Sequence, residues 1–156
     1  MEKTNALRLL DQKKIPYELF EYSVADGKID AISVATKINQ PIEQVYKTLV
    51  AQNEKKQYFV FILPAAKELD FKACARFLTT KSIELIPTKD LLALTGYQRG
   101  GCSPVAMKKV FPTIVSREAE ALETIIVSAG KIGLQMKVKT ELIGNLLHIR
   151  YADITF

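Results

Sequence analysis

Histidine and cysteine are scarce in this sequence, which has one histidine, His148, and two cysteines, Cys74 and Cys102. The cysteines have no metal-ligand spacing around them, so we expect neither a metal ion nor another cofactor. A nucleophile pair of Cys102 and His148 stays open, although no orienting partner for Cys102 is visible. The simpler interpretation makes His148 a surface or packing residue and Cys74 a small core residue. An enzyme of this composition would work by positioning and backbone donors.

Long apolar segments and nucleotide-binding motifs are also missing. Residues 1–5 lack the pattern of a secretory signal peptide, and no apolar run approaches the length of a membrane span. With so few cysteines, the interpretation is a cytoplasmic protein. The glycine-rich stretch 96–104 follows a predicted helix and contains a proline, so it does not match a dinucleotide fingerprint, and there is no Walker loop. We therefore expect neither nucleotide-triphosphate nor NAD chemistry.

The composition that is present is that of an ordinary globular protein. Apolar residues make up 48% of the 156 residues and charged residues 25%. This length and balance predict one domain over residues 1–156 that buries a core unaided. The net charge of +5, with lysines spread along the chain, permits a polyanionic partner without requiring one.

Helical and strand patterns alternate irregularly along the chain. Apolar spacing, N-cap residues such as Thr4, Asp30 and Thr140, and breakers such as Pro16 predict helices over 5–14, 31–38, 70–78, 89–94 and 140–147. Runs of β-branched and aromatic residues predict strands over 17–22, 45–51, 57–63, 82–86, 113–115, 124–128, 134–138 and 149–155. The polar turn 53–56 predicts a hairpin of the second and third strands, and the small residues 128–133 predict a turn between the sixth and seventh. This order lacks strict βαβ alternation, so the fold class is α+β, with a mixed sheet and helices packed around it.

Two features of this pattern suggest a binding site. Three glycines fall within the stretch Gly96–Pro104, and successive backbone N–H groups in such a loop can face an anion or a developing oxyanion. The alternative is a tight turn between packed elements. Lys47 shares a strand face with apolar Val45 and Leu49, so its ammonium either reaches water past them or serves a site. The residues alone leave both pairs of alternatives open.

Three segments taken together resemble the YbaK/EbsC family of Cys-tRNA(Pro) deacylases, relatives of the editing domain inserted in bacterial prolyl-tRNA synthetases. The segments are Val45–Val50, Gly96–Pro104 and Val127–Gly133, in this order and spacing. The similarity covers almost the whole chain. It implies a mixed, barrel-like curled sheet with surrounding helices. It also implies release of a mischarged amino acid from the 3′ end of a tRNA.

The resemblance also assigns roles to individual residues. Lys47 matches the family's essential lysine, which would hold the terminal phosphate or ribose region of the acceptor end. Thr48 matches a residue lining the same pocket, and Tyr22 matches a pocket aromatic that would pack on the terminal adenosine or on the aminoacyl group. These three are expected to surround the substrate.

Two loops would complete that site. Gly100 and Gly101 match the loop whose main chain faces the reacting ester, and Ser103 follows in the same motif as a substrate-binding candidate. Ser128 matches the polar residue of the second loop. The family pattern in that loop is two glycines followed by basic residues, from which Ala129 and Ile132 depart.

The missing nucleophile agrees with what the resemblance implies, because the cysteine substrate's own thiol would attack its ester carbonyl and leave as a thiolactone. Cys102 would then be a bystander. The expected partners are the cysteine-carrying acceptor end of tRNA(Pro) and prolyl-tRNA synthetase, with Cys-tRNA(Cys) as a further substrate. Alternatives are a deacylase for alanine or another small amino acid, a non-catalytic module that binds the acceptor end or a synthetase, and a phosphate-ligand binding protein unrelated to tRNA.

Overall fold

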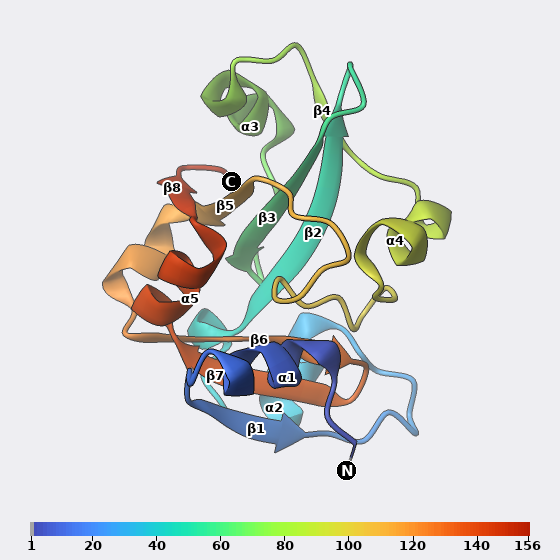
Figure 1. Cartoon of the computed structure of the whole chain (residues 1–156), viewed down its shortest axis with the longest axis vertical. Coiled ribbons are helices and arrows are strands. Elements are labelled where there is room, and N and C mark those ends of the chain that lie inside the picture. Colours follow the sequence, from blue (N-terminus) through green and yellow to red (C-terminus); the bar gives the residue numbers. More distant parts are fainter. Residues whose placement is uncertain (1) are drawn as a thin grey trace.

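Two β-sheets and five α-helices make up the computed structural model, which describes residues 2–156 (Figure 1). The helices are α1 Asn5–Gln12, α2 Ala31–Lys37, α3 Phe71–Leu78, α4 Thr88–Thr95 and α5 Thr140–Leu147. The strands are β1 Tyr17–Glu21, β2 Tyr46–Asn53, β3 Tyr58–Pro64, β4 Ile83–Leu85, β5 Thr113–Ser116, β6 Thr124–Lys131, β7 Leu134–Lys139 and β8 Arg150–Ala152. Short 3₁₀ helices cover Ile42–Gln44 and Arg117–Ala121. The α+β class and the predicted element order are confirmed.

The larger sheet has the strand order β4-β2-β3-β5-β8. β2 and β3 form the predicted antiparallel hairpin, whose turn is held by the Asn53 carboxamide oxygen, which accepts from the Lys55 and Gln57 amides at 3.0 and 2.9 Å. β3 and β8 both run parallel to β5, so this sheet is mixed, as expected. The last strand is shorter than predicted, because after Ala152 the chain leaves the sheet and Thr155 pairs with Leu69 instead.

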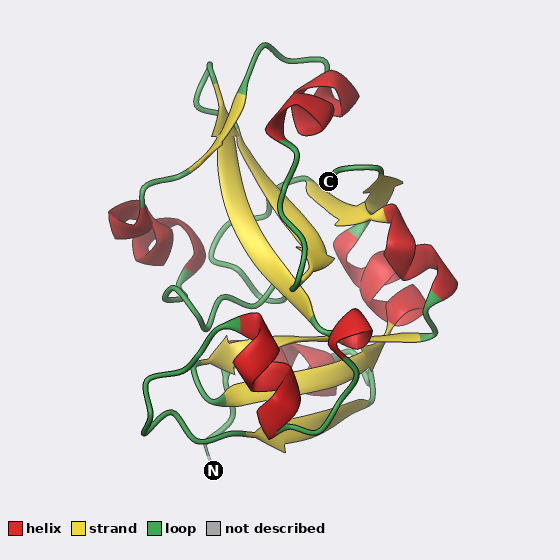
Figure 2. Cartoon of the chain, turned by 180° about the vertical axis from the view of Figure 1, so that it is seen from behind, coloured by secondary structure: helices red, strands yellow, loops and turns green. Residues whose placement is uncertain are grey.

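The smaller sheet has the order β1-β7-β6 and lies between two helices. On β6, Ile125 and Val127 share a core with Leu7 and Leu10 of α1, whereas Ile126 packs into a separate cluster with Val34 of α2. This alternation follows from the period-2 geometry of a strand. Figure 1 shows α1 across one face of the sheet and Figure 2 shows α2 across the other. The small sheet is therefore buried on both faces.

The turn between β6 and β7 differs from the sequence prediction. We expected a turn over 128–133, but β6 continues to Lys131 and only Ile132 and Gly133 connect the strands. A bulge between Ser128 and Lys131 accommodates the small residues Ala129 and Gly130. Gly130 has φ +102°, and a Cβ on it would lie 2.9 Å from a ring carbon of Tyr97. The residues are small because the bulge packs closely against Tyr97.

The two sheets join where Val45, just before β2, forms a parallel bridge with Ile126 on β6. No closed barrel is seen among residues 2–156, so the barrel-like curl stays unconfirmed. Within the same range, none of the helices combines the length and the apolar character that crossing a lipid bilayer requires.

Local capping signals account for most helix starts. The side chains of Thr4 and Asp30 accept hydrogen bonds from the backbone N–H three residues ahead, at 3.2 and 3.0 Å, as predicted. The expected cap at Thr140 is wrong, because Lys139 occupies the N-cap position without a side-chain bond and Thr140 is already helical. Pro87 precedes α4, whose C-terminal cap is Gly96 with φ +84°. This cap turns the chain directly into the glycine-rich loop.

Candidate functional site

A cavity of about 540 Å³ opens beside β2, between the β1–α2 connection, the first half of α4, the glycine-rich loop and the β6–β7 hairpin. Five of the seven residues proposed from the sequence line it: Tyr22, Lys47, Thr48, Gly100 and Ser128. The remaining two, Gly101 and Ser103, lie in the same loop as Gly100 but outside the lining. The fold therefore gathers segments from distant parts of the chain around one concave site, the usual setting for a small ligand.

Strand β2 supplies the cation. Lys47 pairs with Leu63 of β3 in the hairpin register, and its side chain is 27% exposed. Its ammonium lies 3.9 Å from the Glu68 carboxylate, which is itself 84% exposed. An exposed ion pair at this distance contributes roughly 0–1 kcal/mol to stability, so Lys47 remains available to bind a ligand. Arg99, an exposed cation that the sequence analysis did not select, lines the same cavity.

Three hydroxyl groups of lining residues are buried without a partner. They are Tyr22 Oη, Tyr46 Oη and Thr48 Oγ1, and none of them has a hydrogen-bond partner among residues 2–156. Leaving a buried polar group unpaired costs about 1–3 kcal/mol, so such groups call for a ligand or another explanation. Tyr22 is placed by its own N–H, which donates to the Gly133 carbonyl at 3.0 Å. The resemblance assigned two of these residues, Tyr22 and Thr48, to the substrate pocket.

The glycine-rich loop divides its two adjacent glycines between two environments. Gly100 is exposed, lines the cavity and has φ +86°. Gly101 is buried against the β6–β7 hairpin, where a Cβ would lie 2.8 Å from the Ile132 backbone nitrogen. Its N–H already donates to the Gln98 carbonyl at 2.9 Å. Gly101 is therefore required by close packing, whereas Gly100 faces the cavity.

Ser103 and Cys102 belong to the base of that loop. Ser103 is fully buried, and its Oγ accepts a hydrogen bond from the Val105 N–H at 3.2 Å. Burial raises the pKa of the Cys102 thiol to about 12, so it is a neutral thiol near pH 7 although it lines the cavity. His148 sits at the C-terminal end of α5, outside the cavity lining. The structure thus does not gather Cys102 and His148 into one site.

The β6–β7 hairpin adds one residue that the sequence analysis missed. Ser128 Oγ accepts from the Gly130 N–H at 3.1 Å, and Gln135 stands directly opposite Ser128 in the register. Gln135 is only 7% exposed and lines the cavity. The signal was a polar residue between Leu134 and Met136 in an otherwise buried strand. Its carboxamide offers the cavity both a donor and an acceptor.

The cavity holds no carboxylate and no imidazole, so its lining offers no ordinary general base. Residues 2–156 also include no cluster of three or more His, Cys, Asp or Glu side chains placed to bind a metal ion. The cavity offers two cations, Lys47 and Arg99, and several hydrogen-bond donors without a partner. Such a site can orient a ligand and stabilise negative charge.

Comparison with known proteins identifies the fold and the family. Residues 28–144 match the family of the aminoacyl-tRNA editing domain. The chain is 42% identical over 154 residues to a protein of Enterococcus faecalis provisionally named Cys-tRNA(Pro)/Cys-tRNA(Cys) deacylase EbsC, covering 99% of this chain and 94% of that protein. It is 24% identical over 132 residues to the proline–tRNA ligase of Lactobacillus delbrueckii subsp. bulgaricus, covering 84% of this chain and 23% of the ligase.

Among solved structures, one provisionally described as a trans-editing enzyme for prolyl tRNA synthetase superposes with a TM-score of 0.85 at 17% identity. The superposition covers 100% of this chain and 99% of the other, so the two share the whole fold. The family match over most of the chain and the 42% identity over nearly all of it agree with each other. The chain therefore belongs to the aminoacyl-tRNA editing domain family.

Proposed function

We propose that this protein is a trans-editing deacylase that releases cysteine from mischarged Cys-tRNA(Pro) and also acts on Cys-tRNA(Cys). The observation that carries the proposal is a cavity that gathers Tyr22, Lys47, Thr48, Gly100 and Ser128 and leaves the buried hydroxyls of Tyr22 and Thr48 unpartnered. The name of the Enterococcus relative, 42% identical to this chain, supports the same substrate class. Its tRNA partner would be tRNA(Pro) charged by prolyl-tRNA synthetase, with which this protein would share the substrate.

The lining suits the end of an aminoacyl-tRNA. A volume of about 540 Å³ lies within the range of small-ligand pockets and leaves room for an aminoacyl group with its ribose. Lys47 and Arg99 would attract phosphates of the single-stranded CCA end, and this attraction should weaken as salt rises. Exchanging the exposed Glu68 carboxylate for a phosphate would cost Lys47 little, because that ion pair is long and open.

The chemistry we propose is supplied by the substrate. The cysteine sulfur attacks the ester carbonyl carbon, forming a C–S bond and an oxyanion. The bond from that carbon to the ribose oxygen then breaks, the thiol proton ends on the ribose hydroxyl, and a thiolactone leaves. The uncommitted donors, Tyr22 Oη, Thr48 Oγ1 and the Gly100 N–H, can hold the ester and the developing oxyanion. This scheme needs no base in the cavity.

The test is the rate of amino acid release from Cys-tRNA(Pro), Ala-tRNA(Pro) and Pro-tRNA(Pro), measured for the wild type and Lys47→Ala. We expect cysteine to be released and proline spared, and the variant to lose on the order of 100-fold in kcat/KM through lost positioning. Lys67→Ala is the matched control, since Lys67 also pairs with a carboxylate, Glu118 at 3.1 Å, but lies outside the cavity lining. Faster release of alanine than cysteine would move the substrate assignment to alanine, and binding without release would leave only an acceptor-end binder.

A further inference from the structure

The connection between β1 and α2, residues 23–30, forms a wall of the proposed site although every residue in it is exposed. Its Ile29 lines the cavity, and the Ile29 Cδ1 atom lies 3.0 Å from the position that a Cβ on Gly100 would take. We call residues 23–30 the β1–α2 loop. Its contact with Gly100 means that the loop closes the cavity from the side opposite the core. The position of Ile29 then decides how much room an aminoacyl side chain has.

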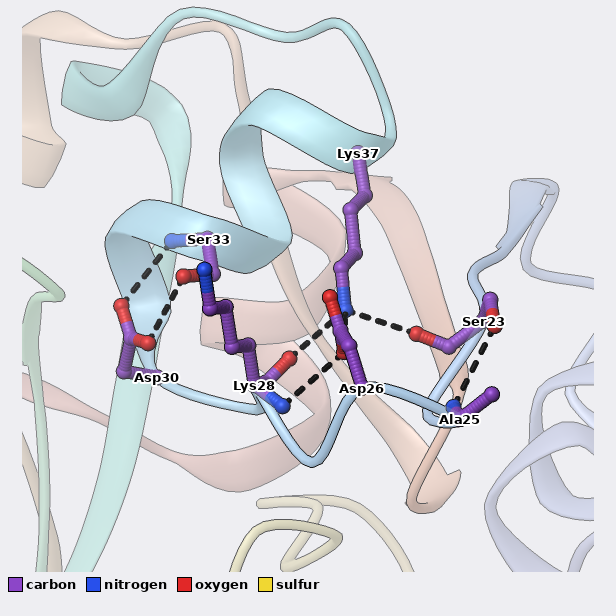
Figure 3. A network of polar contacts seen from close by, with 7 residues as sticks. All are labelled: Ser23, Ala25, Asp26, Lys28, Asp30, Ser33 and Lys37. Atoms are coloured by element: carbon purple, nitrogen blue, oxygen red, sulfur yellow. Dashed lines mark hydrogen bonds and ion pairs between the residues drawn. The ribbon is translucent and has the colours of Figure 1, made fainter.

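One lysine holds this loop from outside. The Lys37 ammonium, at the end of α2, donates to the Ser23 carbonyl, the Lys28 carbonyl and the Asp26 carboxylate, each at 2.8 Å (Figure 3). These bonds use all three donors of the ammonium, so Lys37 has none left for a substrate. The side chain is 21% exposed, which shields the contacts from water. The carboxylate bond also lowers the pKa of Asp26.

No other polar contact ties the middle of the loop to the rest of the described chain. Within residues 2–156, the other hydrogen bonds of residues 23–28 are internal: Ala25 N–H to Ser23 Oγ, Gly27 N–H to the Val24 carbonyl, and Lys28 N–H to Asp26 Oδ1. At the far end, Asp30 caps α2 through the backbone and hydroxyl of Ser33, at 3.0 and 2.7 Å (Figure 3). The loop is therefore a self-bonded turn attached to α2 through Lys37.

Lys37 also lies beside the other residue that the loop carries into the site. Its ammonium is 6.0 Å from the centre of the Tyr22 ring, close enough for a weak cation–π attraction. Tyr22 directly follows β1 and has its buried hydroxyl unpartnered. The same cation thus borders Tyr22 at one end of the loop and fixes the segment leading to Ile29 at the other.

We propose that Lys37 is a positioning residue that sets the size selectivity of the cavity by fixing the β1–α2 loop against the glycine-rich loop. The proposal rests on the proposed deacylase function. With Lys37 in place, Ile29 stays over Gly100 and excludes aminoacyl side chains larger than cysteine. Without it, the loop keeps its internal turn but loses its attachment, and the wall moves outward.

The test uses Lys37→Met, which keeps an unbranched apolar stem and removes the ammonium with its three donors. Native-state hydrogen exchange should be about 10-fold faster at the Ala25, Gly27 and Lys28 amides, equivalent to losing one charge-assisted hydrogen bond. The ratio of release from tRNA(Pro) charged with cysteine to release from tRNA(Pro) charged with leucine should fall by about 10-fold or more. A merely structural role would lower both rates in parallel and leave their ratio unchanged.

Lys137→Met is the matched control. Lys137 is 25% exposed, 3.9 Å from the Glu18 carboxylate and 5.7 Å from the Phe20 ring centre, but it lies on β7 and does not touch the β1–α2 loop. It should leave exchange in the loop and the cysteine-to-leucine ratio unchanged. Asp26→Asn, which weakens one of the three contacts, should shift both readouts in the same direction by less, and it serves if Lys37→Met does not fold.

The outcomes separate this proposal from the deacylase assignment. If the wild type releases no amino acid, the proposed function fails while the exchange comparison still decides whether Lys37 holds the loop. Wild-type exchange in Lys37→Met would overturn the positioning role. Faster exchange with an unchanged cysteine-to-leucine ratio would overturn the selectivity role.

Discussion

The two loops that face each other across the cavity are held in opposite ways. The glycine-rich loop is anchored in the core by Tyr97, Cys102 and Ser103, which are all buried. The β1–α2 loop is exposed throughout, including Val24 at 43% and Ile29 at 37%, and is attached through one lysine. One wall is therefore fixed by packing and the other by charge. This difference suggests that the packed wall holds the reacting ester while the charged wall sets what enters beside it.

The largest effect should come from breaking the packed wall at its closest contact. In Gly101→Ala, the new Cβ would lie 2.8 Å from the Ile132 nitrogen and 3.0 Å from the Lys131 carbonyl carbon, both backbone atoms that cannot rotate away. We expect a loss of about 1–3 kcal/mol in the free energy of unfolding and on the order of 100-fold in cysteine release. Denaturant titration and single-turnover kinetics measure the two.

Gly27→Ala is the control from the charged wall. Gly27 has φ +72° but nothing within 4 Å of a new Cβ, so only backbone strain of about 1–2 kcal/mol is expected. If Gly101→Ala were as stable and active as the wild type, the packed wall would not be fixed as described.

Removing one hydroxyl under the packed wall should affect stability to a similar extent but without the loss of cysteine release. Tyr97 is buried and its hydroxyl donates to the Val105 carbonyl at 2.6 Å, and burial raises its pKa to about 12. Tyr97→Phe leaves that carbonyl unpaired and should lower the free energy of unfolding by about 1–3 kcal/mol. Tyr17→Phe, which removes an exposed hydroxyl bonded to Asp11 at 2.9 Å, should cost less. Equal losses in the two variants would contradict the role given to burial.

The smallest effect is a response to acid confined to the charged wall. Hydrogen bonds from Lys37 and from Ser33 lower the pKa of Asp26 and Asp30 below their ordinary 3.8. Because the folded-state pKa is the lower one, these carboxylates stabilise the loop above their unfolded pKa. That contribution is lost as the pH falls through the folded-state pKa. Exchange protection at the Lys28 and Ser33 amides should therefore drop below about pH 4.

The packed wall should not respond over the same range. Burial raises the pKa of Tyr97 and of Cys102 to about 12, so both side chains stay neutral in acid. The Gly101 amide, bonded to the Gln98 carbonyl, reports on it. Simultaneous loss of protection in both loops would show that acid unfolds the whole protein and not one wall.

The features predicted correctly from the sequence are those that depend only on residues close together in the chain. Thr4 and Asp30 were recognised as caps because a cap needs only the next three residues, and the turn after Asn53 is equally local. Lys47 is a candidate from the sequence because it shares a strand face with apolar residues, and in the structure it lines the cavity. Its catalytic role and those of the other proposed residues remain predictions.

Long-range features could not be read in the same way. The bulge at Ala129 and Gly130 exists because Tyr97, more than thirty residues earlier, fills the space beside them. Gln135 lies beside the cavity because it pairs with Ser128 in the strand register. The predicted turn over 128–133 did not include this pairing. Lys37 is an ordinary helix-ending lysine in sequence, and only the fold shows the three acceptors around it.

The most direct test of substrate-assisted cleavage compares release of cysteine and of S-methylcysteine from the same tRNA(Pro) by the wild-type protein. The central claim is that the cavity positions and stabilises the ester while the substrate's thiol supplies the nucleophile, because no carboxylate or imidazole lines the site. We predict that cysteine is released and that S-methylcysteine, whose sulfur cannot form the thiolactone, stays on the tRNA. Release of both at similar rates would contradict it and require a water nucleophile activated by the protein.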